Sequence, residues 1–255
     1  VVERPASVVK ELVENAVDAG ASRIDVSVEG GGRGLIRVAD DGCGMTPDEV
    51  AVSLDRHATS KLRAVDDLLD VQTMGFRGEA LPSIASVSRL TIVSRVQARA
   101  EGFRIELAGG RRVRAEPAGS RPGTLVEVAD LFHNTPARLK FLKRTATELA
   151  HVSEAIIRLA LANPGVHLTL TLQGRRGLDL PARDDLLARA RQVLGRRVET
   201  LLAATVREDG LEVLTGLSPP EQAVRSPRSV YVLVNRRALR DRALVHAVVA
   251  GYGGL

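Results

Sequence analysis

The residues with the clearest chemical potential lie on one face of a helix predicted near the start of the chain. Glu11, Asn15 and Asp18 are spaced at i, i+4 and i+7, so they share one face of that helix. The opposite face is apolar and is formed by Val9, Leu12, Val13, Ala16 and Val17. One interpretation is a solvated polar face, which is usual for an amphipathic helix. The other is chemical: Asn15 binds magnesium through its amide oxygen, and Glu11 orients or deprotonates a water molecule.

A second candidate group is Asp40, which ends a predicted strand and is followed by Gly42 and Gly44. A carboxylate in this position can accept a hydrogen bond from an exocyclic amine, and the glycines let the backbone approach a flat base closely. Asp-Gly is also a common turn pair, so the segment taken alone is more simply a tight turn.

A third candidate is the loop that contains Gly75 and Gly78 and leads into a helix. Free N–H groups and the positive end of a helix favour phosphate binding. The pattern is not a Walker loop, because no Gly-Lys-Ser/Thr follows it, and it is not a Rossmann fingerprint. Alone, this glycine pair does not identify a phosphate site.

The elements that must position these groups alternate between helix and strand, which predicts an α+β fold. Residues 23–39 are expected to form a hairpin, and Thr46 with Glu49 forms a capping box that starts a helix ending near Asp55. Helices are predicted at 5–19, 46–55, 65–69, 79–87, 134–143, 147–161, 184–194 and from 241 onward. Further strands are predicted at 90–94, 102–107, 112–116, 124–128, 166–172, 177–180, 201–206, 212–216 and 230–234. A domain boundary is expected near residues 181–183.

Composition limits the function classes. A hydrophobic content of 44% and a charged content of 26% are ordinary for a folded globular chain. No apolar run is long enough to span a membrane, and no signal peptide opens the chain. The single cysteine, Cys43, excludes an internal disulfide and fits a reducing compartment. The absence of clustered Cys and His residues makes a zinc site unexpected.

The basic residues are unevenly distributed. Residues 1–127 carry 17 Lys and Arg against 19 Asp and Glu, whereas residues 128–255 carry 19 against 12. This excess suggests a polyanion contact in the second half of the chain, through phosphates rather than through base stacking, because aromatic residues make up only 2%. A GC-rich genome that uses Arg freely explains the same excess equally well, since 32 of the 36 basic residues are Arg.

Together the three candidate groups resemble the ATP-site motifs of the GHKL ATPases, which include gyrase-type topoisomerases, large heat-shock chaperones and histidine kinases. Longer stretches are similar to the MutL family of DNA mismatch repair proteins. These stretches are residues 2–15, 56–61 (RHATSK), 75–81 (GFRGEAL), 134–138 (NTPAR) and 234–241. The similarity is dense over residues 1–145 and thinner beyond.

The resemblance implies a Bergerat-type (GHKL) ATP-binding α/β sandwich over residues 1–181, followed by a partial ribosomal-protein-like βαβ transducer domain over 182–255. It implies that Glu11 is the catalytic base, that Asn15 is the magnesium ligand and that Asp40 holds the adenine amine, whereas it gives Asp18 only a structural role. The implied nucleotide-binding set is Asn15, Asp40, Gly42, Gly44, Met45, Thr59, Ser60, Lys61, Gly75, Phe76, Arg77, Gly78, Glu79, Ala80, Leu81 and Thr124. The implied DNA-contacting residues are Arg237, Arg240 and Arg242.

The implied function is a switch in DNA mismatch repair that binds ATP with Mg2+, hydrolyses it slowly and dimerises in the full-length protein. Its implied partners are a mismatch-recognition protein, a downstream helicase or nuclease, and DNA bound without sequence preference. The expected location is the bacterial cytoplasm at the nucleoid, or the nucleus of a eukaryote. Two other functions stay open: a DNA-binding scaffold with a silent ATP site, and another GHKL ATPase such as a topoisomerase subunit, which the runs at 56–61 and 75–80 disfavour.

The sequence departs from the family pattern at two positions. Asp41 stands where many relatives have Asn and is expected to face away from the base pocket, and Arg236 replaces a usual glycine. The chain starts with Val1, and both an N-terminal arm and a transducer lysine that reaches the γ-phosphate are expected to lie outside these 255 residues. We therefore expect this chain by itself to bind ATP weakly, to hydrolyse it slowly if at all, and to be mostly monomeric.

Overall fold

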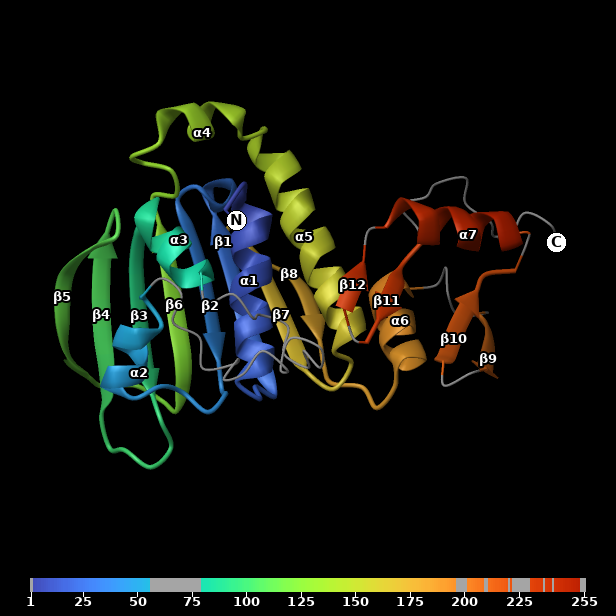
Figure 1. Cartoon of the computed structure of the whole chain (residues 1–255), viewed down its shortest axis with the longest axis horizontal. Coiled ribbons are helices and arrows are strands. Elements are labelled where there is room, and N and C mark those ends of the chain that lie inside the picture. Colours follow the sequence, from blue (N-terminus) through green and yellow to red (C-terminus); the bar gives the residue numbers. More distant parts are fainter. Residues whose placement is uncertain are drawn as a thin grey trace. The chain divides into compact units, whose positions relative to one another are not determined.

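The computed structural model describes residues 2–55, 79–195, 201–208, 211–219, 221, 230–235, 237–239 and 241–252. The chain forms two compact units (Figure 1). The first unit comprises Val1–Ile156 with Val166–Pro181, and the second comprises Ile157–Gly165 with Ala182–Leu255. The assignment of residues 1–181 and 182–255 to an ATP-binding domain and a transducer domain remains a prediction.

The first unit is built on an eight-stranded sheet with the order β5-β4-β3-β6-β2-β1-β7-β8. Its strands are β1 (Arg23–Glu29), β2 (Leu35–Asp40), β3 (Arg89–Arg95), β4 (Gly102–Ala108), β5 (Arg111–Ala118), β6 (Gly123–Ala129), β7 (His167–Leu172) and β8 (Arg175–Leu180). Neighbouring strands are antiparallel except for β1 and β7, which are parallel. The predicted hairpin is confirmed, with Val26 paired to Val38.

Helices cover one face of this sheet (Figure 1). The helices of the first unit are α1 (Pro5–Asp18), α2 (Pro47–Val52), α3 (Ala80–Ser86), α4 (Pro136–Phe141) and most of α5 (Thr145–Ala162), with a short 3-10 turn, η1, at Gly30–Gly32. α1 contacts β1 and β2, and α3 contacts β3 and β4. Strand residues facing these helices are buried, as in Ile24, Val26, Ile36, Leu90 and Ile92. The alternate residues form a polar open face, which suits an antiparallel sheet covered on one side.

The apolar face of α1 holds the helix on the sheet. Its buried residues are Pro5, Ala6, Val8, Val9, Leu12, Val13 and Ala16. Each fully buried Val or Leu contributes roughly 1.5–3 kcal/mol relative to an exposed one. Gly20 follows the helix with a φ of +74°, a conformation that favours glycine. The sequence pattern is therefore confirmed, although Val17 is only half-buried and Val8 completes the buried face.

The helix predicted to begin near Thr46 is also confirmed by its cap. The Thr46 hydroxyl accepts a hydrogen bond from Glu49 N, and the Glu49 carboxylate accepts one from Thr46 N at 2.8 Å. This reciprocal arrangement satisfies two donors that a helix start otherwise leaves unpaired. It fixes where the chain leaves the loop after Asp40 and enters α2.

The second unit contains α6 (Leu186–Leu194), β9 (Leu202–Glu208), β10 (Leu211–Leu217), β11 (Val232–Val234), β12 (Arg237–Leu239) and α7 (Arg242–Tyr252). β9 pairs with β10 and β11 pairs with β12, both antiparallel. Strand β12 was not expected from sequence, because three residues carry too little periodicity to signal a strand. Across the residues that the structure describes, we find no helix with the length and apolar character needed to cross a membrane.

Candidate nucleotide-binding site

Asp40 is the last residue of β2. One of its carboxylate oxygens accepts two backbone hydrogen bonds, and the other has no partner among the described residues. Its Oδ1 accepts hydrogen bonds from Gly42 N at 2.9 Å and from Thr124 N at 3.3 Å. No partner for Oδ2 occurs among the described residues. Partial burial raises the pKa of Asp40, the two backbone hydrogen bonds oppose this effect, and the nearby charge of Asp41 adds to it. The structure thus fixes one oriented acceptor at the end of β2, an interior strand of the sheet.

A buried hydroxyl ties the surrounding segments together. Ser94 lies in β3 with no exposed surface, and its Oγ accepts a hydrogen bond from Met45 N at 2.8 Å. The same Oγ lies 3.1 Å from Gly123 O and 2.8 Å from Thr124 Oγ1. Ser94 therefore links the loop after Asp40 to the start of β6. Ser94 is not among the residues predicted from the sequence, although a signal for it is present: it is a polar residue at the third inward position of the strand, after Leu90 and Ile92.

The glycines of this loop are required by contacts within the protein itself. Gly44 has a φ of +69°, and a Cβ there would lie 2.1 Å from Arg95 O. A Cβ on Gly42 would lie 2.9 Å from both the Cβ and the carbonyl oxygen of Ala19. From the sequence, these glycines are expected to allow close approach of a base. The structure gives a separate and sufficient reason, which is close packing against β3 and the end of α1.

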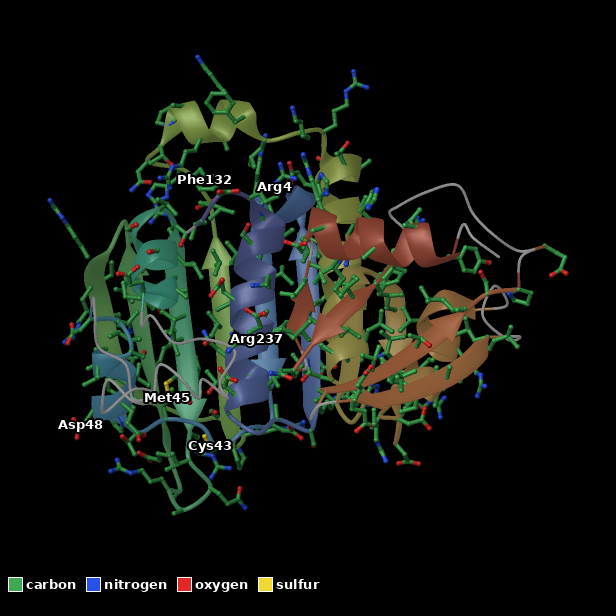
Figure 2. All side chains as sticks on the ribbon, turned by 45° about the vertical axis from the view of Figure 1, so that its right-hand side comes forward. Arg4, Cys43, Met45, Asp48, Phe132 and Arg237 are labelled. Carbon is green, nitrogen blue, oxygen red and sulfur yellow. The ribbon has the colours of Figure 1, made fainter. Side chains whose placement is uncertain are left out.

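The loop after Asp40 lies at the C-terminal end of α1. Cys43 N donates a hydrogen bond to Ala19 O at 2.9 Å, and Figure 2 shows Arg4 and Cys43 at opposite ends of this helix. The side chains of Asn15 and Glu11 are half-buried and follow one another along the helix away from the loop. Glu11 lies about 12 Å from Ala19 along the helix axis, given a rise of 1.5 Å per residue. The loop after Asp40, Asn15 and Glu11 therefore follow one another from the C-terminal end of α1 toward its middle.

The polar face of α1 is acidic. Burial raises the pKa of Glu14, its ion pair with Lys10 at 3.1 Å opposes this, and the charges of Glu11 and Asp18 raise it further. Repulsion among these carboxylates means that the face favours a nearby cation. Among the described residues no group of three or more His, Cys, Asp or Glu side chains is arranged to hold a metal. That finding is compatible with magnesium, which often takes one or two protein ligands together with phosphate oxygens and water.

Asp41 has a separate, structural set of contacts. Its Oδ1 accepts hydrogen bonds from Ser22 N and Arg23 N, both at 2.8 Å, and its Oδ2 accepts one from the Ser22 hydroxyl. Burial acts to raise the pKa of Asp41, but these hydrogen bonds outweigh it and lower the pKa. Asp41 therefore holds the start of β1, in agreement with the expectation that it faces away from the base pocket.

The remaining predicted site residues are only partly described. Helix α3 begins at Ala80 with Glu79 at its N-cap, and Ala80 and Leu81 are half-buried there. Arg237 lies in β12, and Arg242 is exposed at the start of α7. The predicted residues Thr59, Ser60, Lys61, Gly75, Phe76, Arg77, Gly78 and Arg240 lie outside the described residues, as does Arg236.

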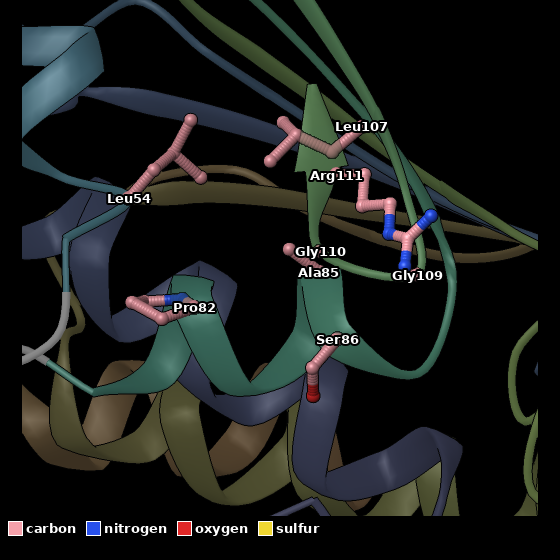
Figure 3. Close-up of a pocket in the computed structure, with 8 residues that line it drawn as sticks. All are labelled: Leu54, Pro82, Ala85, Ser86, Leu107, Gly109, Gly110 and Arg111. Carbon is pink, nitrogen blue, oxygen red and sulfur yellow. The ribbon is translucent and has the colours of Figure 1, made fainter. Parts of the chain in front are cut away.

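A cavity of about 280 Å³ lies between the end of α2, α3 and the β4–β5 hairpin (Figure 3). It is lined by Leu54, Pro82, Ala85, Ser86, Leu107, Gly109, Gly110 and Arg111. None of the predicted site residues lines it. The Asp40 site is thus defined by its hydrogen bonds and not by this cavity.

Comparison with known proteins supports the resemblance seen in the sequence. Residues 3–108 match the family model described as histidine kinase-, DNA gyrase B- and HSP90-like ATPase. The chain is 49% identical over 255 residues to the DNA mismatch repair protein MutL of Anaeromyxobacter dehalogenans strain 2CP-1. A solved structure, the Aquifex aeolicus MutL ATPase domain complexed with ADP, is 32% identical, with a TM-score of 0.76 over 98% of this chain and 88% of that one.

The chain belongs to the MutL family. A second structure, the ATPase domain from the bacterial mismatch repair endonuclease Aquifex aeolicus MutL, is 30% identical with a TM-score of 0.72. The expected GHKL fold of mixed α+β class is therefore confirmed for this MutL-family chain. The chain spans 42% of the length of the Anaeromyxobacter relative, so the activities of a whole MutL protein are proposals for this chain.

Proposed function

We propose that the first unit binds ATP with its adenine at Asp40 and its phosphates toward Glu11 and Asn15. The observation that carries this proposal is the Asp40 carboxylate, which is held through Oδ1 and leaves Oδ2 without a partner among the described residues. Oδ2 accepts a hydrogen bond from the adenine amine. Met45 and Thr124, which Ser94 joins, flank the base. The ADP complex of the Aquifex MutL domain supports a nucleotide as the ligand.

The catalytic roles follow from the position of the two polar residues along α1. Glu11 accepts a proton from the water that attacks the terminal phosphate, a role that typically contributes about 10²–10⁴-fold to a rate. Asn15 would hold Mg2+ through its amide oxygen, and the bound ion would supply positive charge beside the phosphates. The proposed nucleotide-binding set also includes residues 59–61 and 75–81, of which the structure describes only Glu79, Ala80 and Leu81. The acidic face of α1 supports the binding of a cation there.

In the full-length protein the nucleotide serves as a switch in DNA mismatch repair. ATP binding favours a dimer, and slow hydrolysis limits its lifetime, which links a mismatch-recognition protein to a downstream helicase or nuclease. Such a switch requires that the nucleotide bind one state more tightly than the other. The MutL relatives support this role, and the bacterial sources of those named above support a bacterial setting.

Calorimetric titration of the 255-residue chain with ATP and Mg2+ tests the nucleotide site. We expect saturable heat from the parent and none from Asp40→Ala. A chain that serves only as a DNA-binding scaffold produces no nucleotide heat in either case. Omission of Mg2+ is the second arm, and we expect it to weaken the binding of ATP more than that of adenosine.

DNA binding is the second part of this proposal, through phosphate contacts of Arg237, Arg240 and Arg242. We expect DNA affinity to fall as salt rises and to fall further when Arg237 and Arg240 are both changed to Ala. Filter binding at several salt concentrations measures both effects. Affinity that ignored salt and these substitutions would remove the second unit from the DNA interface.

A further inference from the structure

The cavity between α2, α3 and the β4–β5 hairpin combines an apolar lining with a single charge. Its volume of about 280 Å³ lies just below the range of about 300–1,000 Å³ that is usual for small-ligand pockets. Leu54, Pro82, Ala85 and Leu107 supply apolar side chains, and Arg111 is the charged residue among the described lining residues. Figure 3 shows Leu54 and Pro82 on one side and Leu107 with Arg111 on the other. The cavity therefore suits a small ligand with an apolar body and one charged group.

Hydrogen bonds to the rest of the first unit fix the walls of this cavity. At the end of α3, Asn134 Nδ2 donates a hydrogen bond to Ser86 O at 2.8 Å. The hairpin is tied to the same end of α3, because Gly109 N donates to Ser88 O at 3.0 Å. The hydroxyl of Ser86 donates to Ser83 O at 2.8 Å, so this polar group is satisfied within the helix. The cavity is therefore preformed, and a ligand can enter it without a large rearrangement.

The turn of the hairpin lines the cavity without filling it. Gly109 and Gly110 have φ values of +57° and +81°, and two positive values in succession are typical of a two-residue type I′ turn. A Cβ on Gly110 would lie 3.5 Å from Ser86 Cα, so the turn packs directly on α3. Both glycines are lining residues and carry no side chain. The space beside Leu107 therefore stays open.

The guanidinium of Arg111 has no counter-charge within the part of the chain that the structure describes. Arg111 is exposed and forms no ion pair or side-chain hydrogen bond with a described residue. Other arginines of the hairpin differ, because Arg104 pairs with Glu106 at 2.7 Å and Arg114 pairs with Glu116 at 2.8 Å. A guanidinium binds a carboxylate through two parallel N–H···O hydrogen bonds. Arg111 is therefore available to a carboxylate ligand at the cavity.

We propose that this cavity binds a small monocarboxylate with a compact apolar body. The body packs against Leu54, Pro82 and Leu107, and the carboxylate pairs with the Arg111 guanidinium. A polyanion fits less well, because the described lining residues offer no second cation.

The proposed carboxylate site is separate from the proposed nucleotide site. None of the residues predicted to bind nucleotide lines the cavity. The two sites share only α3, whose first residue, Ala80, belongs to the predicted nucleotide set, whereas Pro82 and Ala85 line the cavity. The carboxylate proposal therefore goes beyond the ATP proposal and does not depend on it.

2-Naphthoate is the probe, and 2-naphthamide is its uncharged counterpart of nearly the same shape. The chain contains no Trp, so naphthalene fluorescence can be followed with little interference from the protein. We expect the fluorescence anisotropy of 2-naphthoate to rise saturably when it is titrated with the 255-residue chain in the absence of nucleotide. We expect 2-naphthamide to bind about 5-fold more weakly, which is the upper value for loss of an exposed ion pair. Absence of saturable naphthoate binding would overturn the proposal.

Arg111→Gln tests the charged group, and Arg112→Gln is the matched control. Both arginines are exposed and adjacent on β5, but only Arg111 lines the cavity. Arg111→Gln should lower naphthoate affinity about 5-fold, to the level of naphthamide, and leave naphthamide affinity unchanged. Arg112→Gln should bind both probes as the parent does. An equal loss of naphthoate affinity in the two variants would show only a general attraction of anions to arginines and would overturn the proposal.

Leu54→Ala tests the apolar lining, and Val52→Ala is its control. Leu54 is half-buried and lines the cavity, whereas Val52 is 51% exposed on α2 and does not line it. Leu54→Ala should weaken both probes by a similar factor of about 5, because the apolar body is common to them. Ala85→Leu fills the cavity and should abolish saturable binding of both; Leu54→Ala keeps the test valid if this variant does not fold. Parental affinity for naphthoate in both Leu54→Ala and Arg111→Gln would place the probe elsewhere and refute the proposal.

Discussion

Asp40→Asn separates the contribution of Asp40 to folding from its contribution to binding. The substitution preserves the shape of the side chain. An Asn Oδ1 can accept the same hydrogen bonds from Gly42 N and Thr124 N that the Asp Oδ1 accepts now. The amide nitrogen then occupies the position of Oδ2, which has no partner among the described residues. The charge is removed without loss of the backbone hydrogen bonds.

The expected effect on folding is a gain at neutral pH. Burial raises the pKa of Asp40 in the folded state, so its contribution to stability is full below the unfolded pKa and is lost as pH rises through the folded pKa. Each unit of such a rise costs about 1.4 kcal/mol, reduced here because the carboxylate is only partly buried. Asp40→Asn should therefore be at least as stable as the parent at pH 7. This advantage should shrink as pH falls through the folded pKa and approach zero below the unfolded pKa of about 3.9, where the carboxyl is protonated in both states.

The expected effect on binding has the opposite sign. If Oδ2 accepts from the adenine amine, the Asn nitrogen places an N–H against another N–H. Loss of a hydrogen bond to a charged group costs about 1.5–3 kcal/mol, which weakens affinity about 10- to 150-fold. If the Asn side-chain amide flips so that its oxygen faces the adenine amine, it no longer accepts the hydrogen bonds from Gly42 N and Thr124 N. The assays are urea unfolding at pH 7 and pH 4 and calorimetric titration with ATP and Mg2+.

Asp41→Asn is the adjacent control with reversed expectations. The hydrogen bonds from Ser22 and Arg23 lower the pKa of Asp41, so its stabilisation is present above the unfolded pKa and is lost as pH falls through the folded pKa. The variant should lose about 1 kcal/mol at pH 7 and keep the parental ATP affinity. The reasoning is refuted if Asp40→Asn binds ATP as the parent does, or if it proves the less stable of the two variants at neutral pH.

Three further substitutions test the site. Glu11→Ala should keep nucleotide affinity and lose turnover about 10²–10⁴-fold in a steady-state phosphate-release assay on a longer chain that hydrolyses ATP; equal turnover would remove Glu11 as the base. Gly44→Ala should prevent folding or lower the urea midpoint far more than Gly20→Ala, because both have positive φ but only Gly44 lacks room for a Cβ. Ser94→Ala should cost about 2–3 kcal/mol and weaken ATP binding, whereas Ser88→Ala, equally buried but bonded only to a helix carbonyl, should cost about 1 kcal/mol and leave binding unchanged.

Much of the fold could be predicted because its signals are local. The period of the apolar residues placed α1, the β1–β2 hairpin and most later strands, and Thr46 with Glu49 marked the start of α2. The candidate residues Glu11, Asn15 and Asp40 also came from short motifs. Their joint function as an ATP site was predicted from the resemblance to a family, because spacing along a helix does not distinguish a solvated polar face from a binding site.

Local sequence patterns are enough to predict the types of element, their order and the residues able to do chemistry. Which of these residues meet depends on the tertiary structure, because the contacts join strands and loops far apart in the chain. Thr124 donates to Asp40 across 84 residues, and Met45 reaches Ser94 across 49. Asp41 likewise accepts hydrogen bonds from Ser22 and Arg23, which lie in a different segment of the chain. The exposure of Phe141 could not be predicted either, because an apolar residue beside lysines does not by itself indicate an exposed side chain. Periodicity records which side of an element is apolar, but the partner of each side is set by how the sheet is assembled.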